Sequence, residues 1–364
     1  MIVPVRSLKE GHVLKKDVFS VATTPLIKSR TVLKETHLTF LRAFSIKEVE
    51  IDSLNEVNIE EALQSEEWVE EVRHTDESFF YRYNEAVQAF KRNFESWQAG
   101  VPIAIHDVRN LMVPLFNEVI EAPIYLLALH EYNHPKDYRY HHAISVGLLS
   151  ASLAHKLNYE AKEWVQIGLA AVLADIGMTK MNPSVLDKSG PLTATEYNEI
   201  KQHPVHSYQM IKGSASLTDA AKLAVLQHHE RLDGEGYPFG SKQSKIHPYS
   251  EIIAVADIYH AMSSERVYRA KHSIFFILEE MRRQRFGLLN VSVVLTLTEL
   301  LLQHSNGATV RLNSGETGEI VFINPQDLTR PMIKLSGSDE IMNLQQAPHQ
   351  HIEDLLKINK KMLV

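Results

Sequence analysis

The sequence predicts a mainly α-helical protein with a small α+β unit at its N-terminus and a small β appendage near its C-terminus. Three observations predict this arrangement. Short β-type runs, separated by Gly and Pro turns, fill residues 1–56. Apolar residues then recur at three-to-four spacing, which is typical of amphipathic helices, as far as about residue 303. Three further short β-type runs follow after residue 308.

Length predicts more than one folded unit, because 364 residues are long for a single domain. We place a small α+β domain at 1–56 and a helical connecting region at 57–132. A helical domain is expected at 133–290, and a C-terminal helix with the β appendage at 291–364. The 44% hydrophobic and 23% charged fractions are those of a globular chain with a substantial core.

Composition excludes several classes of function. The chain has no cysteine, which excludes disulfides and thiolate metal sites. A formal charge of -7 argues against binding to a nucleic-acid polymer, which needs concentrated Lys and Arg. No apolar run is long enough to cross a bilayer, and the charged start is not a signal peptide. We therefore expect a bacterial-type cytoplasmic protein that does not use a membrane.

Each element follows from its local pattern. In the N-terminal unit, strands are expected at 2–5, 12–21, 31–33 and 48–51, and a short helix at 35–44. Helices with apolar residues at helical spacing are expected at 79–97, 105–120, 138–157, 161–175, 218–230, 250–263 and 291–303. Thr193 and Glu196 have capping-box spacing and predict a helix that runs through His203. The appendage has expected strands at 309–312, 319–323 and 332–335.

Histidines are concentrated in the predicted helical domain. Of the 19 in the chain, 11 lie between His130 and His260. With the aspartates they form a series at regular separations: His142, Asp175, His203, His228, His229 and Asp257. Histidine and aspartate are ligand types that divalent metals select.

Asp175 is the sharpest clue in this series. It follows two almost wholly apolar turns, and Asp257 lies in a similar apolar run. A buried carboxylate is costly unless it is paired, protonated or bound to a cation. Between two metals about 3.5–4 Å apart, it would support a bridging hydroxide and hold a phosphoryl group. Two other interpretations stay open, an N-cap for a neighbouring helix and a buried ion pair.

The pair His228-His229 is harder to explain structurally. Neighbouring side chains on a helix point about 100° apart, so a helix end is expected where both reach one site. The glycine-rich loop that follows allows backbone amides to approach a ligand closely.

Residues 228–238, His-His-Glu-Arg-Leu-Asp-Gly-Glu-Gly-Tyr-Pro, resemble the signature of the HD-GYP domain, a branch of the HD phosphohydrolase superfamily. The resemblance covers about 133–290 and includes residues 186–193, 201–204, 254–259 and 266–269. It implies a helical HD-type domain that binds two or three divalent metals, often iron or manganese. It also implies hydrolysis of cyclic di-GMP or a related cyclic dinucleotide in signal transduction.

Carried across position by position, the resemblance assigns roles to individual residues. Asp175 would be the catalytic, bridging carboxylate. Tyr237 would lie beside the substrate in a loop that Gly236 and Pro238 shape. Arg266 and Arg269 match positions that contact substrate phosphates and bases, a task that suits guanidinium groups; an alternative for both is a surface ion pair. The metal ligands would be His142, Asp175, His203, His228, His229 and Asp257.

The chain departs from the family pattern at three positions. Ala174 stands where the family's His-Asp pair has histidine, and Met178 stands where a phosphate-facing lysine is usual. Lys180 is near in sequence but is expected to point elsewhere. His260 stands where aspartate is usual, three residues after Asp257 and on the same helix face. We expect one retained metal and a second that is weakened.

Two functions follow from this pattern. The first is a metal-dependent cyclic di-GMP phosphodiesterase, in which metal-bound hydroxide attacks the phosphodiester. The alternative is a catalytically inactive HD-GYP protein that senses a cyclic dinucleotide or binds other signalling proteins as a scaffold. His142, His203 and the His228-His229 pair favour metal binding, whereas Ala174 and Met178 favour loss of turnover.

Overall fold

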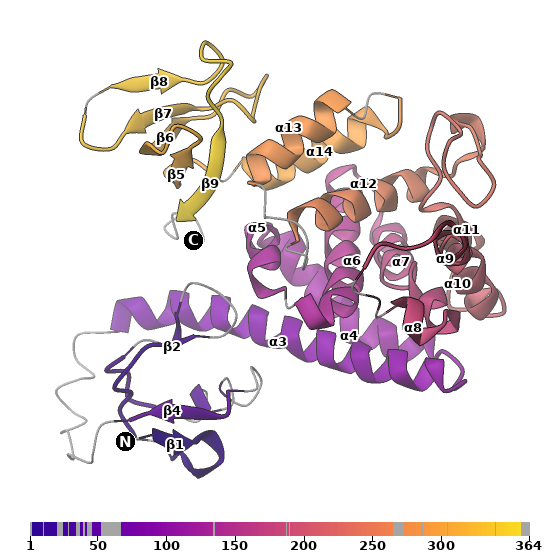
Figure 1. Ribbon diagram of the computed structural model, residues 1–364, viewed down its shortest axis with the longest axis horizontal. Helices are drawn as coiled ribbons and strands as arrows, with labels where there is room; N and C mark the ends of the chain where they lie inside the picture. Colours follow the sequence, from indigo (N-terminus) through magenta and orange to yellow (C-terminus); the bar gives the residue numbers. More distant parts are fainter. Residues whose placement is uncertain are drawn as a thin grey trace. The chain divides into compact units, whose positions relative to one another are not determined.

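The computed structural model of the chain describes most of its residues (Figure 1). The residues described are 2–9, 11–19, 25–27, 29–33, 37–38, 41, 46–51, 67–133, 135–186, 188, 190–264, 273–284, 287–303, 305–338 and 340–357. They form two compact units, Met1–Ala86 and Val87–Val364, and the boundary falls within helix α3 (Glu67–Gln98). The domain boundaries expected at residues 56, 132 and 290 stay predictions.

The first unit contains two antiparallel strand pairs. Strand β1 (Ile2–Pro4) pairs with β4 (Glu48–Glu50), and β2 (Val18–Phe19) pairs with β3 (Pro25–Ile27). A 3-10 turn, η1 (Val5–Ser7), follows β1. Apolar side chains that alternate along these runs make one small buried cluster: Val3, Val5, Leu8, Leu14, Val18, Ile27, Leu33, Leu38, Leu41, Val49 and Ile51. The small α+β unit is therefore present, while much of the helix expected at 35–44 lies outside the described residues.

The second unit begins with helices. Their bounds are α4 (Ile105–Glu121), α5 (Tyr125–Ala128), α6 (Tyr138–Lys156), α7 (Ala161–Val172), α8 (Pro183–Leu186), α9 (Ala194–Ile200), α10 (His203–Ile211), α11 (Asp219–Gln227), α12 (Pro248–Ser263), α13 (Ile274–Gln284) and α14 (Val291–Leu302). Short 3-10 turns are η2 (Leu129–Tyr132), η3 (Pro135–Asp137), η4 (Ile176–Lys180) and η5 (Gln243–Lys245).

Helix α6 lies at the centre of this unit. Every residue from Tyr140 to Ala154 is buried, because α6 packs against α4, α7, α12 and α14. Helix α7 is likewise buried along most of its length, as its apolar sequence predicts. The two helices therefore provide a rigid, water-excluding base on which the polar groups of the domain are placed.

A five-stranded antiparallel sheet follows the helices, in the order β8-β7-β6-β5-β9. Its strands are β5 (Thr309–Leu312), β6 (Thr317–Phe322), β7 (Met332–Leu335), β8 (Ile341–Asn343) and β9 (Ile352–Lys357). Alternate residues of β5 and β7 are buried, which is the pattern of a sheet with one covered face. Strand β9 contacts α13.

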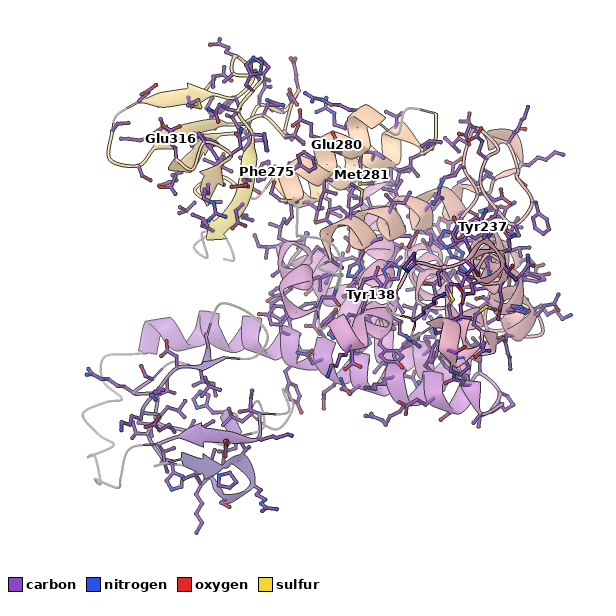
Figure 2. The ribbon with its side chains drawn as sticks, in the orientation of Figure 1. Tyr138, Tyr237, Phe275, Glu280, Met281 and Glu316 are labelled. Atoms are coloured by element: carbon purple, nitrogen blue, oxygen red, sulfur yellow. The ribbon has the colours of Figure 1, made fainter. Side chains whose placement is uncertain are left out.

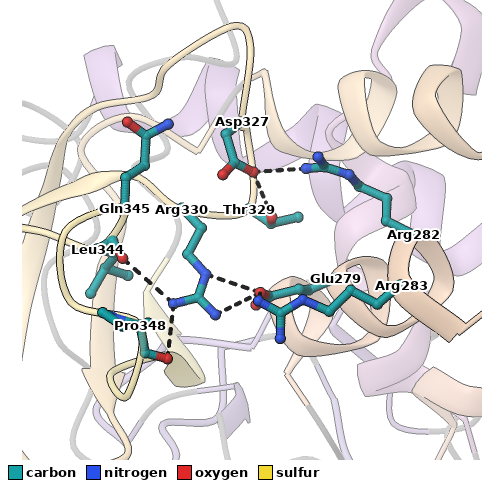
Figure 3. Close-up of a pocket in the computed structure, with 9 residues that line it drawn as sticks. All are labelled: Glu279, Arg282, Arg283, Asp327, Thr329, Arg330, Leu344, Gln345 and Pro348. Atoms are coloured by element: carbon teal, nitrogen blue, oxygen red, sulfur yellow. Dashed lines mark hydrogen bonds and ion pairs between the residues drawn. The ribbon is translucent and has the colours of Figure 1, made fainter.

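Ion pairs join this sheet to α13 beside a pocket (Figure 3). Arg330, which is 8% exposed, donates to Glu279 from Nε at 3.0 Å and from Nη2 at 2.6 Å. Arg282 pairs with Asp327 at 2.7 Å. Ser273, just before α13, donates from its hydroxyl to the carbonyl of Ile352 on β9. The helix is thus held to the sheet at several points along its length.

The predicted class, mainly helical with a small N-terminal α+β unit and a small C-terminal sheet, is confirmed. Several element predictions were wrong in detail. In the segment 12–21, only Val18–Phe19 forms a strand among the described residues, and the strand expected at 31–33 is reduced to an isolated bridge between Val32 and Val13. Helix α7 ends at Val172, three residues before Asp175. The helix begun by Thr193 stops at Ile200, and α10 is a separate helix from His203. Strands β8 and β9 were not foreseen. Among the described residues, no helix combines the length and apolarity needed to cross a membrane.

Candidate metal centre

Asp175 lies in the turn between α7 and η4, where two residues fix the backbone. The Ser207 hydroxyl donates to the carbonyl of Ala174 at 2.6 Å and accepts from the amide of Gly177 at 2.7 Å. A Cβ atom on Gly177 would lie 2.1 Å from the carbonyl oxygen of His203, so the turn and α10 approach too closely for any other residue. The turn is therefore fixed against the start of α10, which brings Asp175 to His203.

The first group of candidate ligands surrounds one oxygen of Asp175. Its Oδ1 lies 3.1 Å from Nε2 of His203 and 3.3 Å from Nε2 of His228. The two Nε2 atoms lie 3.2 Å apart. With His229, these residues place one ligand atom each within 4.8 Å of one another.

Backbone contacts set the orientation of two of these rings. Nδ1 of His203 lies 2.7 Å from the carbonyl oxygen of Ile200, and Nδ1 of His228 lies 2.7 Å from that of Val225. Because a carbonyl can only accept, both Nδ1 atoms carry the proton, and in the neutral ring both Nε2 lone pairs face the cluster. Two nitrogen lone pairs and a carboxylate that converge in this way suit a divalent cation.

A second group surrounds the other oxygen of Asp175. Its Oδ2 lies 3.8 Å from Nε2 of His142, which is 3.0 Å from Oδ1 of Asp257. The remaining oxygen of Asp257 lies 3.6 Å from Nδ1 of His229. Asp175 therefore stands between two groups of nitrogen and oxygen ligands. This is the place expected for a bridging carboxylate.

The environment shifts the pKa values of three members. Burial raises the pKa of Asp175, but the adjacent His203 and His228 outweigh it and hold that pKa well below the usual range. Burial acts in the same way on Asp257, and the adjacent His142 again holds its pKa below the usual range. Burial and the neighbouring His228 lower the pKa of His229. Two ionised carboxylates with a neutral imidazole are the protonation states that metal ligands need.

The loop after His229 closes one side of the cluster. The ring of Tyr237 lies 4.7 Å from that of His229 between centroids, and its amide donates to the His229 carbonyl at 3.2 Å. A Cβ atom on Gly236 would lie 2.3 Å from the amide nitrogen of Arg231, so only glycine fits there. The Tyr237–Pro238 peptide bond is cis. Tyr138 on α6 and Tyr237 thus reach the site from different elements (Figure 2).

Comparison with known proteins agrees with this geometry. Residues 127–288 match the model of a family described as the HD domain. This part of the chain therefore matches the HD domain family. Since the match covers the cluster and its loop, the predicted HD-type fold class is confirmed for this part of the chain.

Relatives of the HD domain extend the comparison. A cyclic di-GMP phosphodiesterase of Pseudomonas aeruginosa is 27% identical over 92% of this chain and 84% of its own length. The cyclic di-GMP phosphodiesterase response regulator RpfG of Xanthomonas campestris is 37% identical, but the match spans 36% of this chain and 35% of the relative. Bd1817, an HDG"Y"P protein of Bdellovibrio bacteriovorus, has a similar fold, with a TM-score of 0.52 at 14% identity over 82% of this chain and 97% of that one.

The three departures lie at or next to the centre of the HD domain. Ala174 is buried, and its side chain supplies no ligand atom. Met178 is partly buried on η4, and Lys180 is exposed. His260 is 1% exposed and contacts Nδ1 of His142, the nitrogen that faces away from Asp257.

The structure brings together all the predicted ligand residues: His142, Asp175, His203, His228, His229 and Asp257. It places Gly236, Tyr237 and Pro238 in the loop beside them. Arg266 and Arg269 lie outside the described residues.

Two residues that position the site were not predicted. One is Ser207. The other is Glu230, which is 3% exposed and accepts from the amides of Phe239 at 2.8 Å and Ser241 at 2.7 Å. Glu230 lies inside the 228–238 motif, so its position in the sequence could have indicated a role in the site. Ser207 offers no such signal, because it acts on the backbone of another segment.

Proposed function

We propose that this chain is a metal-dependent phosphodiesterase of the HD-GYP type that hydrolyses cyclic di-GMP. The observation that supports the proposal most directly is the convergence of Asp175 with the Nε2 atoms of His203 and His228. The relatives named as cyclic di-GMP phosphodiesterases support the choice of substrate. Hydrolysis would add water across one phosphodiester bond and leave a linear dinucleotide.

Two overlapping ligand sets would hold the metal ions. Asp175, His203, His228 and His229 form the fuller set, and Asp175 with His142 and Asp257 forms the other. Iron or manganese bound there would activate water and neutralise charge on the phosphoryl group. Because Ala174 supplies no ligand to the second set, we expect one tightly bound ion per chain and one weak site.

The protein's own side chains orient the reaction. The hydrogen bonds from His203 and His228 to backbone carbonyls keep their Nε2 atoms aimed at Asp175 and at the cation that would bind beside it. Tyr237 is placed to form a wall for the bound nucleotide, and burial keeps its pKa raised, so the phenol stays protonated. Arg266 and Arg269 are proposed to hold the phosphates and bases.

A hydrolysis assay tests this function. Wild-type protein loaded with manganese should hydrolyse cyclic di-GMP more slowly than about 1 per second, a low rate for an enzyme. The double variant Ala174→His, Met178→Lys should be faster by at least about tenfold, because it restores a ligand and a phosphate-facing cation. Met178→Leu, which keeps the apolar volume, is the matched control and should match wild type. A double variant that binds two ions yet hydrolyses nothing would contradict the proposal.

A second candidate is a catalytically inactive sensor or scaffold that binds a cyclic dinucleotide or another signalling protein. Ala174 and Met178 favour it, since both replace groups that act in turnover. The same assay separates the two functions. A sensor should bind cyclic di-GMP without releasing linear product at any manganese concentration.

A further inference from the structure

His142 has a different environment at its outer nitrogen from the other histidines of the centre. Its Nδ1 lies 3.0 Å from Nδ1 of His260 and 3.2 Å from the hydroxyl oxygen of Tyr138. The corresponding atoms of His203 and His228 contact backbone carbonyls, which can only accept. The orientation of His142 therefore depends on two side chains.

His260 occupies a confined position behind His142. It is 1% exposed, and its ring lies 5.0 Å from that of His142 between centroids. The hydroxyl oxygen of Ser264, which is 4% exposed, lies 3.3 Å from Nδ1 of His260 and 3.4 Å from its Nε2. When the His260 proton is on Nε2, Ser264 can accept it there, and the Nδ1 lone pair is free to accept from His142.

We infer that His260 is a positioning residue that accepts the N–H of His142 Nδ1 and so aims the Nε2 lone pair of His142 at a cation shared with Asp257. This inference rests on the proposed metal centre. For His142 to bind a cation through Nε2, its proton must be on Nδ1. His260 Nδ1, at 3.0 Å, lies nearer to that nitrogen than the Tyr138 hydroxyl oxygen does, at 3.2 Å.

A neutral imidazole is a weaker partner than a carboxylate for this task. A carboxylate only accepts and carries charge, so it raises the basicity of the ligand that it holds, whereas an imidazole can accept or donate. The set formed by Asp175, His142 and Asp257 already lacks a ligand at Ala174. Its histidine, His142, is also the one held by an imidazole and not by a carboxylate. Residue 260 and residue 174 weaken the same metal site through different atoms.

The geometry allows a close test, because Nδ1 of histidine and Oδ1 of aspartate or asparagine are both bonded to Cγ. His260→Asp and His260→Asn therefore put an oxygen acceptor near the position of the present nitrogen, one charged and one neutral. His260→Leu removes the acceptor at similar bulk. Exposed His155, which lies on the same helix as His142, gives the matched control His155→Asp.

Manganese titration calorimetry on the chelator-treated full chain provides the readout, without any nucleotide. All variants are made in the Ala174→His background, where the second site has its ligand restored. His260→Asp should raise the affinity for the second Mn2+ ion by about tenfold or more, and His260→Leu should lower it by a similar factor. His260→Asn should bind that ion with an affinity within about threefold of the parent. His155→Asp should change neither ion, and thermal unfolding confirms that each variant is folded.

The outcomes separate the two claims. A second ion with the same affinity in the Asp, Leu and parent chains would overturn the inference while leaving the metal centre intact. A parent that binds a single Mn2+ ion whatever occupies position 260 would overturn it too. Absence of any Mn2+ binding, even by the parent, would instead contradict the proposed function.

Discussion

At the scale of single residues, the site depends on a few atoms that hold the turn before η4. Asp175 reaches two ligand groups only because Ser207 and Gly177 fix that turn against α10. Neither residue is a candidate ligand. The geometry of the centre is therefore set partly by packing between backbone segments.

Gly177→Ala should disturb this arrangement. The new methyl group would lie 2.1 Å from the carbonyl oxygen of His203, so the turn must move away from α10. Overpacking of this kind lowers the free energy of unfolding by about 1–3 kcal/mol, which urea denaturation measures. Manganese affinity should fall as well, because Asp175 moves with the turn. Gly213→Ala is the matched control, since a Cβ there meets nothing within 4 Å; equal effects of the two substitutions would refute the explanation.

The candidate ligand residues could be predicted from the sequence, whereas the residues that support them could not. His142, Asp175, His203 and Asp257 stand out because histidine and aspartate are rare in apolar helical segments. Ser207 has an ordinary sequence environment, and its role depends on contact with a turn that lies about thirty residues earlier, 33 from Ala174 and 30 from Gly177. Such contacts arise from tertiary packing, which one sequence does not show.

At the scale of elements, the loop after α11 is held by one carboxylate. Glu230 accepts from two loop amides, at Phe239 and Ser241, and both contacts are charge-assisted. The loop carries Tyr237, so its position relative to His229 depends on Glu230. The motif 228–238 thus combines candidate metal ligands, the proposed substrate wall and the group that fixes the position of that wall.

Glu230→Gln should loosen the loop and leave the metal ligands in place. An amide keeps one acceptor oxygen, so one charge-assisted hydrogen bond is lost, at a cost of about 1.5–3 kcal/mol in the free energy of unfolding. Affinity for cyclic di-GMP should fall while the manganese content stays unchanged. Glu235→Gln, an exposed residue of the same loop, is the control and should behave as wild type. Loss of manganese with unchanged nucleotide affinity would contradict this role.

Element boundaries were predicted less well than element types. The helix from Thr193 was expected to continue through His203, yet α9 ends at Ile200 and α10 begins at His203. Pro204 was the signal for this break, because proline has no amide to donate to the carbonyl of Ile200 in a continuous helix and suits the first turn of a new one. Strand β9 was missed because it contains three charged residues among its six, Glu353, Asp354 and Lys357, which obscure the alternation expected of a strand.

At the scale of the second unit, a buried ion pair attaches the C-terminal sheet to α13. Arg330 pairs with Glu279 (Figure 3), and their side chains are 8% and 12% exposed. Arg330 also donates to the carbonyl of Gln350 at 2.9 Å. Helix α13 follows the segment 265–272, which carries Arg266 and Arg269. The sheet thus stabilises α13, the helix that follows the proposed substrate-binding arginines in the sequence.

Arg330→Met should therefore destabilise this unit. Removal of Arg330 leaves Glu279 with only the exposed Arg283 as a countercharge, which lowers the free energy of unfolding by about 3 kcal/mol. The double variant Glu279→Leu, Arg330→Met should recover part of that loss, since no unpaired charge remains. Arg311→Met, which breaks an exposed pair with Asp354, should cost no more than about 1 kcal/mol. Equal losses for Arg330→Met and Arg311→Met in urea denaturation would exclude this role for the buried pair.

The central claim is that Asp175 and the surrounding histidines form a divalent metal centre. Elemental analysis of protein purified without a histidine tag tests it most directly, with wild type, Asp175→Asn and the exposed control His155→Ala compared side by side. We predict about one iron or manganese ion per chain in wild type and in the control, and almost none in Asp175→Asn. Equal metal content in wild type and Asp175→Asn, or two tightly bound ions in wild type, would contradict this account.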